Sequence, residues 1–386
     1  MDFSLSEEQE LTRRTVREFA EREIAPRSRR LDETQEFPLD LFQQLGEMGL
    51  LGVVFPPEYG GAGLTYPDFA LIIEELARVD GAIALSVAAH NSLCSNHIYL
   101  AGNEEQKQRW LVPLARGEKI GAWSLTEPTA GSDASGTRTT AVKDGDHYVL
   151  NGSKTFATHG SVCDVAVVFA VTDKSKGKHG ISAFALEKGL PGWRPGRKED
   201  KMGCRASDTA EIVMDNCRVP ASHLVGREGE GFIDALRILD GGRIGIGSLA
   251  VGIAQGAFEQ AVGYARKRQQ FGRPIADFQA VQWMLADSAT EIDAARLLVQ
   301  RAASLRAAGQ DTNLASAMAK LYASETAVRV CDRAVQIHGG YGYVKDYPVE
   351  QKYRDAKITT IGEGTSEIQR LVIARHLIGR ASGQTP

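Results

Sequence analysis

The spacing of apolar residues predicts helices in the first third of the chain. From Ser6 to Arg30, Leu11, Val16 and Phe19 are among the apolar residues at helical spacing, and Ser6 with Gln9 can form a capping box. Further helical patterns cover residues 40–48, 66–79 and 82–101. Turn-forming clusters such as residues 56–63 (PPEYGGAG) separate them. We therefore predict helices only, up to about residue 120.

The pattern changes to strands after Gly121. Short β-branched or apolar runs alternate with turn residues, and the dipeptides Asp144-Gly145 and Asn151-Gly152 are typical of hairpins. The runs are 137–142 (TRTTAV), 147–150 (HYVL), 162–171 (VCDVAVVFAV), 181–186 (ISAFAL) and 208–214 (DTAEIVM), with residues 174–180 as a polar loop. We interpret this region as a compact β-domain.

After Gly231 the helical period returns. A Gly- and Ala-rich helix is expected at 234–266, a long apolar stripe runs over 275–305, and a third covers 314–337 before the break at Gly339-Gly340. The last helical pattern, 367–378, ends at Gly379. Long helices with few loops favour a four-helix bundle. The predicted fold is thus mainly α with a central β-domain: an N-terminal helical domain (1–120), a middle β-barrel or sandwich (121–230) and a C-terminal four-helix bundle (231–386).

Composition excludes several classes of protein. The 386 residues carry a formal charge of -4, which makes a nucleic-acid partner a poor expectation, and 43% hydrophobic residues predict a folded core. Five scattered cysteines without a C-x-x-C pair predict buried thiols in a reducing compartment. The first residues show no signal peptide, and no apolar run predicts membrane insertion. We expect a bacterial cytoplasmic location, or the mitochondrial matrix if a transit peptide was removed.

The common cofactor and metal motifs are absent or misplaced. The nearest match to a dinucleotide fingerprint, Gly245 to Ala250 (GIGSLA), lies within a helical pattern with no strand before it, which argues against a nicotinamide site. No Walker A or H-E-x-x-H sequence occurs. His90 and His97 share a helix face but lack companion ligands, so we predict no metal.

Two segments could carry chemistry. Residues 124–133 (SLTEPTAGSD) combine hydroxyls, a glycine and carboxylates where the helices give way to the β-domain. Taken alone, this composition is more typical of a turn, and a functional interpretation needs a second feature. In residues 361–367 (IGEGTSE), Glu363 has a glycine on each side and precedes a helix capped by Thr365 or Ser366. Backbone N–H groups there could polarise a carbonyl oxygen, as enolate chemistry requires, or the carboxylate could simply stabilise a helix end.

Taken together, several motifs resemble the acyl-CoA dehydrogenase family. These are residues 125–133 (LTEPTAGSD), 266–272 (RKRQQFG), 336–343 (QIHGGYGY), 353–357 (YRDAK) and 363–370 (EGTSEIQR), and their order covers nearly the whole chain. The resemblance implies a flavoprotein oxidoreductase of fatty acid metabolism and β-oxidation that converts an acyl-CoA thioester to the trans-2-enoyl-CoA. FAD would lie between the β-domain and the C-terminal bundle.

The resemblance also implies roles for individual residues. Glu363 resembles the base that removes the α-proton while a hydride passes to flavin N5. The backbone N–H of Glu363 and a ribityl hydroxyl of FAD would hold the thioester carbonyl. Gly364 lies in the same turn and is an expected catalytic and substrate-binding residue. Burial should raise the pKa of this carboxyl, and the helix end opposes that rise. The implied FAD contacts are Leu125, Thr126, Ser132, Phe156 and Thr158 within one subunit, Arg268, Phe271, Gln336, Gly339 and Gly340 toward a neighbouring subunit, and Thr365 and Glu367 near the cofactor. Ser132, Asp240 and Arg243 resemble substrate contacts, although Asp240 and Arg243 could equally be an ion pair at i, i+3.

Some positions differ from the family pattern or limit the substrate. Ala157, His159 and Gln351 replace residues that are commoner in relatives. Relatives that act on isovaleryl-CoA or long chains take their base from the position matched here by Gly242, so Glu363 keeps that role. The stretch 84–97 has no arginine to bind a distal carboxylate, as a glutaryl-CoA enzyme would need.

We therefore expect a short- or medium-chain acyl-CoA dehydrogenase, most like the short-chain (butyryl-CoA) group, that passes electrons to an electron-transferring flavoprotein. The expected assembly is a homotetramer formed as a dimer of dimers. The alternatives are an acyl-CoA oxidase that uses oxygen and a non-catalytic helical scaffold on the same fold.

Overall fold

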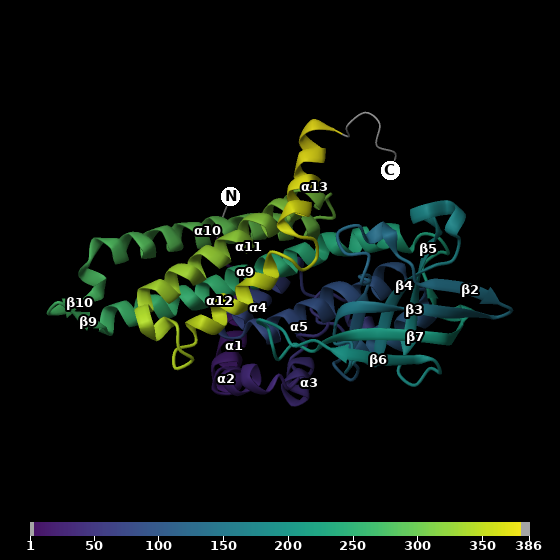
Figure 1. Ribbon diagram of the computed structural model, residues 1–386, viewed down its shortest axis with the longest axis horizontal. Coiled ribbons are helices and arrows are strands. Elements are labelled where there is room, and N and C mark those ends of the chain that lie inside the picture. The colour runs from purple at the N-terminus through teal and green to yellow at the C-terminus, as the bar shows by residue number, and fades with distance from the viewer. Residues whose placement is uncertain (1–3, 380–386) are drawn as a thin grey trace.

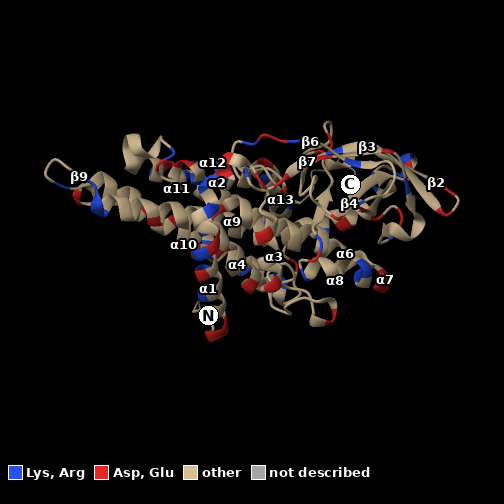
Figure 2. Cartoon of the chain, turned by 90° about the horizontal axis from the view of Figure 1, so that it is seen from below, with Lys and Arg blue, Asp and Glu red and all other residues tan. Residues whose placement is uncertain are grey.

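The computed structural model describes residues 4–379. The β-domain lies at one end of the longest axis and the tip of the C-terminal helices at the other, with the N-terminal helices alongside the C-terminal ones between them (Figure 1). Residues 1–3 and 380–386, the ends of the first and third predicted domains, are outside the described residues. Among the residues described, no helix is long and apolar enough to cross a membrane. Acidic and basic residues are scattered over the helices and strands of all three regions (Figure 2).

The N-terminal region is helical up to the first strand, as predicted. Its α-helices are α1 (Glu7–Phe19), α2 (Ala25–Thr34), α3 (Leu39–Glu47), α4 (Tyr66–Val79), α5 (Gly81–Ala89), α6 (Asn96–Ala101), α7 (Glu104–Gln106) and α8 (Val112–Ala115). The capping box of Ser6 and Gln9 is confirmed. The two longest helices predicted in this region, 6–30 and 82–101, each contain a π-helical turn, at Ala20–Ile24 and His90–Ser95, which the apolar period does not reveal.

The middle region is an eight-stranded mixed sheet. Its strands are β1 (Gly121–Ser124), β2 (Thr140–Asp144), β3 (His147–Thr158), β4 (Val165–Val171), β5 (Ile181–Glu187), β6 (Trp193–Lys198), β7 (Thr209–Pro220) and β8 (Leu224–Val225). The order is β6-β7-β3-β2-β4-β5-β8, and β1 pairs with β4 in parallel. The apolar runs did not predict β1, β6 or β8, which are short or polar, and Lys174–Gly180 forms a 3-10 helix where we expected a loop.

The two predicted hairpin turns have different outcomes. Asp144 and Gly145 do end β2 and begin the β2–β3 hairpin. The turn predicted at Asn151-Gly152 is wrong, because β3 continues through these residues with a register shift against β7 between Leu150 and Gly152. Gly152 has φ 147°, and a Cβ there would overlap Thr139. The glycine thus serves a bulge and a close backbone approach, not a turn.

The C-terminal region is a helical bundle of α9 (Gly231–Lys267), α10 (Gln279–Ala307), α11 (Asn313–His338) and α12 (Val349–Thr359), with α13 (Ser366–Ile378) projecting from it (Figure 1). The short strands β9 (Gln269–Gln270) and β10 (Arg273–Pro274) form the tip between α9 and α10. We had expected residues 367–378 to be the fourth helix of the bundle. Instead α12 packs against α9 and α11; its buried face includes the polar Gln351, Lys352 and Asp355, so an apolar stripe could not predict it.

Buried polar contacts of α12 join the three regions. Asp355 Oδ1 accepts a hydrogen bond from the backbone N–H of Cys204 in the β-domain at 2.5 Å. The Lys352 ammonium donates to the carbonyl oxygens of Ala77 and Val79, at the end of α4, at 3.0 and 2.7 Å. These contacts join the middle of α12 to the other two regions. All five cysteines are buried and unpaired, as predicted.

Candidate active site

Glu363 lies in a sharp turn between α12 and α13. It has φ 54°, an uncommon conformation for a residue with a side chain, and Gly364 follows with φ 94°. Thr365 is the N-cap of α13, and its Oγ1 accepts a hydrogen bond from the Ile368 N–H at 3.3 Å. This confirms Thr365 as one of the two predicted caps. A positive φ is strained for a residue with a side chain, so the contacts around this turn must stabilise the backbone of Glu363.

The Glu363 carboxyl group points at the bundle helix α9. Its Oε2 atom is buried and has no hydrogen-bond partner. A Cβ on Gly242 of α9 would overlap this oxygen and would lie 3.2 Å from Leu93 Cδ2. Burial raises the pKa of Glu363 to about 7, and the positive charges of Lys320 and Arg243 oppose that rise. Desolvation therefore outweighs these two cations, and the pKa of the carboxyl group is raised, as expected for burial.

An apolar cluster lies beside this carboxyl group. Ala89, Leu93 and Ile238 are buried together, and Trp123 and Leu239 pack against them. Leu93 belongs to both this cluster and the surroundings of Gly242, so the cluster adjoins the acid. Such surroundings disfavour the charged form of a carboxyl group and suit the hydrocarbon part of a ligand.

The predicted segment 124–133 is fixed to strand β3 by a buried ion pair. Lys154 is 0% exposed, and its Nζ contacts Glu127 Oε1 at 2.7 Å and the Leu125 carbonyl oxygen at 3.2 Å. The Thr155 N–H donates to the Thr126 carbonyl oxygen at 2.9 Å. The structure thus brings the motif at 125–133 together with the end of β3 that contains Phe156 and Thr158, which the sequence alone could not establish.

The groups exposed along this junction fit a large, partly polar cofactor such as the expected FAD. The Phe156 ring is 65% exposed at φ 57°, so it presents an aromatic face to solvent, and Thr158 follows two residues later on the same strand. The hydroxyl oxygens of Ser124 and Thr155 are buried without a partner. Ser132 is exposed in the loop after β1, where a Cβ on the adjacent Gly131 would meet nothing. Unpaired buried hydroxyls beside an exposed aromatic ring are typical of a ligand site.

The residues expected to contact a neighbouring subunit lie elsewhere. Arg268 and Phe271 belong to the β9–β10 tip of the bundle, and Phe271 is 93% exposed. The Arg268 guanidinium lies over the Tyr341 ring at 5.4 Å. Gln336 is exposed at the end of α11, and Gly339 and Gly340 have open space where a Cβ would be. None of these residues lies in the turn that holds Glu363.

Asp240 and Arg243 form the ion pair that we had kept as an alternative. Arg243 Nη1 donates to Asp240 Oδ1 at 2.8 Å, and the Asn313 amide donates to the same oxygen at 2.8 Å. Arg243 Nε is buried without a partner, and desolvation lowers the pKa of its guanidinium. The pair therefore exists, and the Arg243 Nε–H has no hydrogen-bond partner among the described residues. Thr365 caps α13, and Glu367 is exposed in its first turn.

Sequence reasoning missed several residues around the acid. Lys320 Nζ donates to the Gly364 carbonyl oxygen at 2.7 Å, and Gln369 Nε2 donates to the same oxygen at 2.9 Å. Leu93 and Trp123 line the apolar side. No signal pointed to Lys320, because a lone lysine in an alanine-rich helix is usually solvated.

The histidines have structural partners. His90 contacts the Leu114 carbonyl oxygen at 2.9 Å, and His97 Nδ1 accepts from the Trp123 indole N–H at 3.2 Å. His159, one of the residues that differ from the family pattern, contacts the Gly121 carbonyl oxygen at 2.9 Å. Ala157 is buried in the core, and Gln351 donates to Ser28 Oγ at 3.2 Å. In the described part of the chain, no three His, Cys, Asp or Glu side chains form a metal-binding group.

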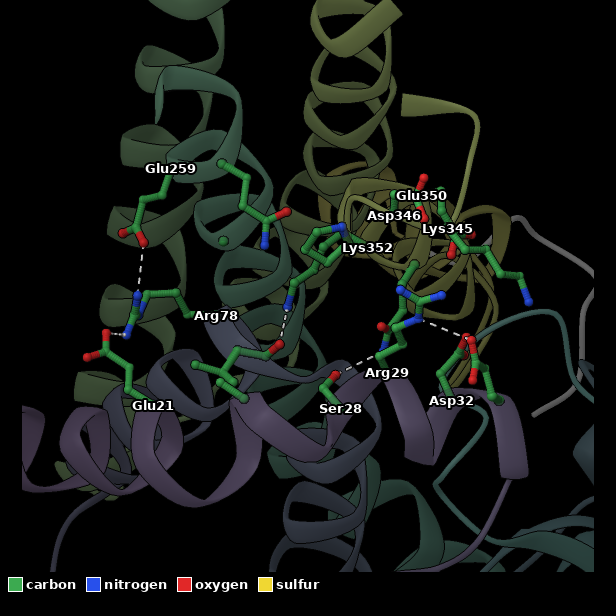
Figure 3. A pocket seen from close by; sticks show the side chains of 17 residues that line it. Glu21, Ser28, Arg29, Asp32, Arg78, Glu259, Lys345, Asp346, Glu350 and Lys352 are labelled. Atoms are coloured by element: carbon green, nitrogen blue, oxygen red, sulfur yellow. Dashed lines mark hydrogen bonds and ion pairs between the residues drawn. The ribbon is translucent and has the colours of Figure 1, made fainter. Parts of the chain in front are cut away.

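A cavity of about 490 Å³ lies elsewhere, between α2, the end of α4, α9 and the start of α12. Figure 3 shows Arg78 between Glu21 and Glu259, and Lys352 over the end of α4. The charged side chains that line this cavity are thus largely paired with one another. We do not assign it as the active site, because neither Glu363 nor the 124–133 segment lines it.

The comparisons with known proteins all identify the same family. Models of the N-terminal, middle and C-terminal domains of acyl-CoA dehydrogenases match residues 6–118, 122–217 and 229–378. The short-chain specific acyl-CoA dehydrogenase of Clostridium acetobutylicum is 52% identical over 374 residues, covering 97% of this chain and 99% of that protein.

Two solved structures share the fold over nearly their whole length. Butyryl-CoA dehydrogenase from Megasphaera elsdenii has a TM-score of 0.96 at 46% identity, covering 98% of this chain and 100% of that one. A chain in the structure described as "Electron transferring flavoprotein of Acidaminococcus fermentans: Towards a mechanism of flavin-based electron bifurcation" has a TM-score of 0.97 at 51% identity, with coverage of 98% and 100%. This chain therefore belongs to the acyl-CoA dehydrogenase family of FAD-dependent oxidoreductases.

Proposed function

We propose that the protein dehydrogenates short- or medium-chain acyl-CoA thioesters to trans-2-enoyl-CoA, with Glu363 as the base. The observation that carries the proposal is the buried, unpaired Glu363 Oε2, which lies beside an apolar cluster and against Gly242. A carboxyl group without a partner in such surroundings is ready to accept a proton from a bound substrate. Similarity to the short-chain enzymes supports a short acyl group.

The proton transfer would use the raised pKa of the base. A carboxylate with a pKa of about 7 is a stronger base than an exposed one, and it is still half ionised at neutral pH. A substrate whose acyl chain lies on Leu93, Trp123 and Ile238 would exclude water from the carboxylate. The α-carbon then faces Oε2, which accepts its proton.

The developing negative charge on the thioester oxygen needs a donor. The backbone N–H of Glu363, fixed by the turn, would donate to this oxygen, as family members do with the same motif. Bound FAD supplies the acceptor for the β-hydride and a second donor for the thioester oxygen. Asp240 and Arg243, which lie on α9 next to Gly242, and Ser132 would contact the CoA portion.

The cofactor would be held by residues of two subunits. We assign Leu125, Thr126, Ser132, Phe156 and Thr158 to the flavin half within one subunit, with Thr365 and Glu367 near it. Arg268, Phe271, Gln336, Gly339 and Gly340 lie away from the Glu363 turn and are exposed or half-buried, so we assign them to the adenosine diphosphate half of a neighbour's FAD. This arrangement requires at least a dimer, and we propose the tetramer that we expected from the sequence. Within each subunit, we propose domain boundaries near residues 120 and 230.

An electron-transferring flavoprotein is the proposed acceptor of the electrons. A protein of this fold, 51% identical, occurs in a structure described by that flavoprotein's name. An oxidase would instead pass electrons to oxygen, and a scaffold would have no flavin. Peroxide formed in air during butyryl-CoA turnover separates the oxidase from the dehydrogenase.

The test is anaerobic reduction of the purified holoenzyme by butyryl-CoA. Loss of the flavin absorbance should follow mixing for the natural protein and for the control Glu105→Gln, which changes an exposed glutamate. Glu363→Gln should slow this bleaching by at least a thousand-fold, on the order of a lost catalytic base. Bleaching at an undiminished rate in Glu363→Gln would refute the assignment.

A further inference from the structure

We propose that Lys320 is a positioning residue: its buried ammonium group holds the Gly364 carbonyl and so fixes the Glu363 carboxylate against α9. The inference rests on the proposed function, because it concerns the base of that reaction. It assigns a role to a residue on α11 that none of the recognised motifs contains.

The contact that carries the inference is direct and buried. Lys320 is 0% exposed, and its Nζ lies 2.7 Å from the Gly364 carbonyl oxygen. A lysine is rarely buried so completely without a specific partner, because its charge loses hydration. Here the partner is the peptide group immediately after the base.

The turn needs such support. Glu363 and Gly364 have consecutive positive φ values, 54° and 94°, and the first costs on the order of 1 kcal/mol or more for a residue with a Cβ. Side-chain hydrogen bonds hold this turn and the end of α12 before it. Lys320 binds the Gly364 carbonyl, and Gln369 binds the carbonyls of both Gly364 and Glu363. Ser324, one turn after Lys320, donates to the carbonyl oxygen of Thr359, the last residue of α12, at 2.7 Å.

Lys320 also acts on the charge of the base. The groups that face this pair are Arg243 from α9, Glu325 from α11 itself and Glu367 from α13. Among the cations opposing the raised pKa of Glu363, Lys320 has the larger effect, ahead of Arg243. Burial lowers the pKa of Lys320 itself to about 8, so its positive charge is still present at neutral pH.

The experiment compares Lys320→Met with Lys352→Met in the holoenzyme. Lys352 is a matched control, because it is also buried and also donates to backbone carbonyl oxygens, but at the end of α4. The readout is the titration of the buried carboxyl group in the infrared, identified as the band that Glu363→Gln removes, together with the pH profile of kcat/KM for butyryl-CoA.

Lys320→Met should raise the midpoint of the carboxyl titration and the acidic limb of the profile by about one pH unit, since a nearby opposite charge shifts a carboxyl by roughly that much or more. At pH 6.5 kcat/KM should then fall by about ten-fold more than at pH 9. Lys352→Met should leave both midpoints unchanged. Lys320→Arg keeps the charge, so its carboxyl titration should have the midpoint of the natural protein even if the variant unfolds at a lower temperature.

Unchanged midpoints in Lys320→Met would overturn the inference and leave the proposed function intact. If Lys320→Met does not fold, Lys320→Gln tests the effect of the charge alone, because it removes the charge and retains a donor for Gly364; unchanged midpoints in this variant would also contradict the inference. Failure of the proposed function is a different result: Glu363→Gln would then keep its rate of flavin reduction.

Discussion

Gly242 and Glu363 lie in contact across the interface between α9 and the α12–α13 turn, so closely that a Cβ on Gly242 would overlap Glu363 Oε2. The glycine is buried within a regular helix, where it weakens helix formation relative to alanine. Its presence is explained by the room that the carboxyl group needs.

Gly242→Ala should therefore impair catalysis more than stability. The methyl group displaces the carboxylate, and a displacement of about 1 Å can cost on the order of a hundred-fold in rate. The measurement is kcat/KM for butyryl-CoA. Gly263→Ala is the control, because a Cβ at that exposed position on the same helix meets nothing. Equal rates in the two variants would show that the carboxyl group does not depend on this space.

The base should lower the stability of the folded protein above neutral pH. The folded pKa of Glu363, about 7, exceeds its unfolded value, so the neutral form favours folding and this stability is lost as pH rises through 7. Glu363→Gln should stabilise the protein by about 1–3 kcal/mol at pH 8 and by less at pH 5. Thermal midpoints of both proteins at the two pH values provide the measurement; a variant less stable at pH 8 would contradict the prediction.

The buried pair of Lys154 and Glu127 should control binding of the flavin. Lys154→Met removes the donor to Leu125 O and leaves Glu127 buried without its cation, at a cost of about 3–5 kcal/mol. We expect weaker binding of FAD, by on the order of ten-fold or more. Fluorescence titration of the apoprotein with FAD measures this, with Lys143→Met on exposed β2 as the control. Equal affinities would exclude a role for the pair in shaping the segment.

His97 should limit stability in acid. It is fully buried, and desolvation lowers its pKa to about 3, so the folded protein holds it neutral while the unfolded chain binds a proton below about pH 6.5. The stability is complete above pH 6.5 and is lost as pH falls toward 3. His97→Gln keeps an acceptor for the Trp123 indole. Between pH 7.5 and pH 5, its free energy of unfolding should fall by about 2 kcal/mol less than that of the natural protein. Chemical denaturation of both proteins at both pH values measures this. An equal loss of stability in the two proteins would contradict the prediction.

The apolar period predicted most of the long helices because each buries one face. Residues 66–79 are an example, since the predicted range is the observed helix α4. It failed at α12, whose buried face includes Lys352 and Asp355, and at β6, whose side chains are half-buried or exposed. It also could not show that Asn151-Gly152 lies in a bulge, because the partner, Thr139, approaches from the segment just before β2.

The candidate site was predictable only in part for a similar reason. Glu363 could be found from its own glycine neighbours and its resemblance to a family motif. Lys320, Leu93 and Trp123 come from three other elements, and nothing in their local sequence indicates that they converge on it. The raised pKa of Glu363 depends on that convergence, so it required the structure.

The most direct test of the account is the rate of flavin reduction by butyryl-CoA as a function of pH, measured by stopped flow without oxygen. If Glu363 is the base, the rate should rise with pH through an apparent pKa near 7 and reach a plateau above it. Glu363→Gln should lack both the rise and the fast phase. A natural enzyme whose rate is already at its plateau at pH 5, or a glutamine variant with the same rise, would contradict the account.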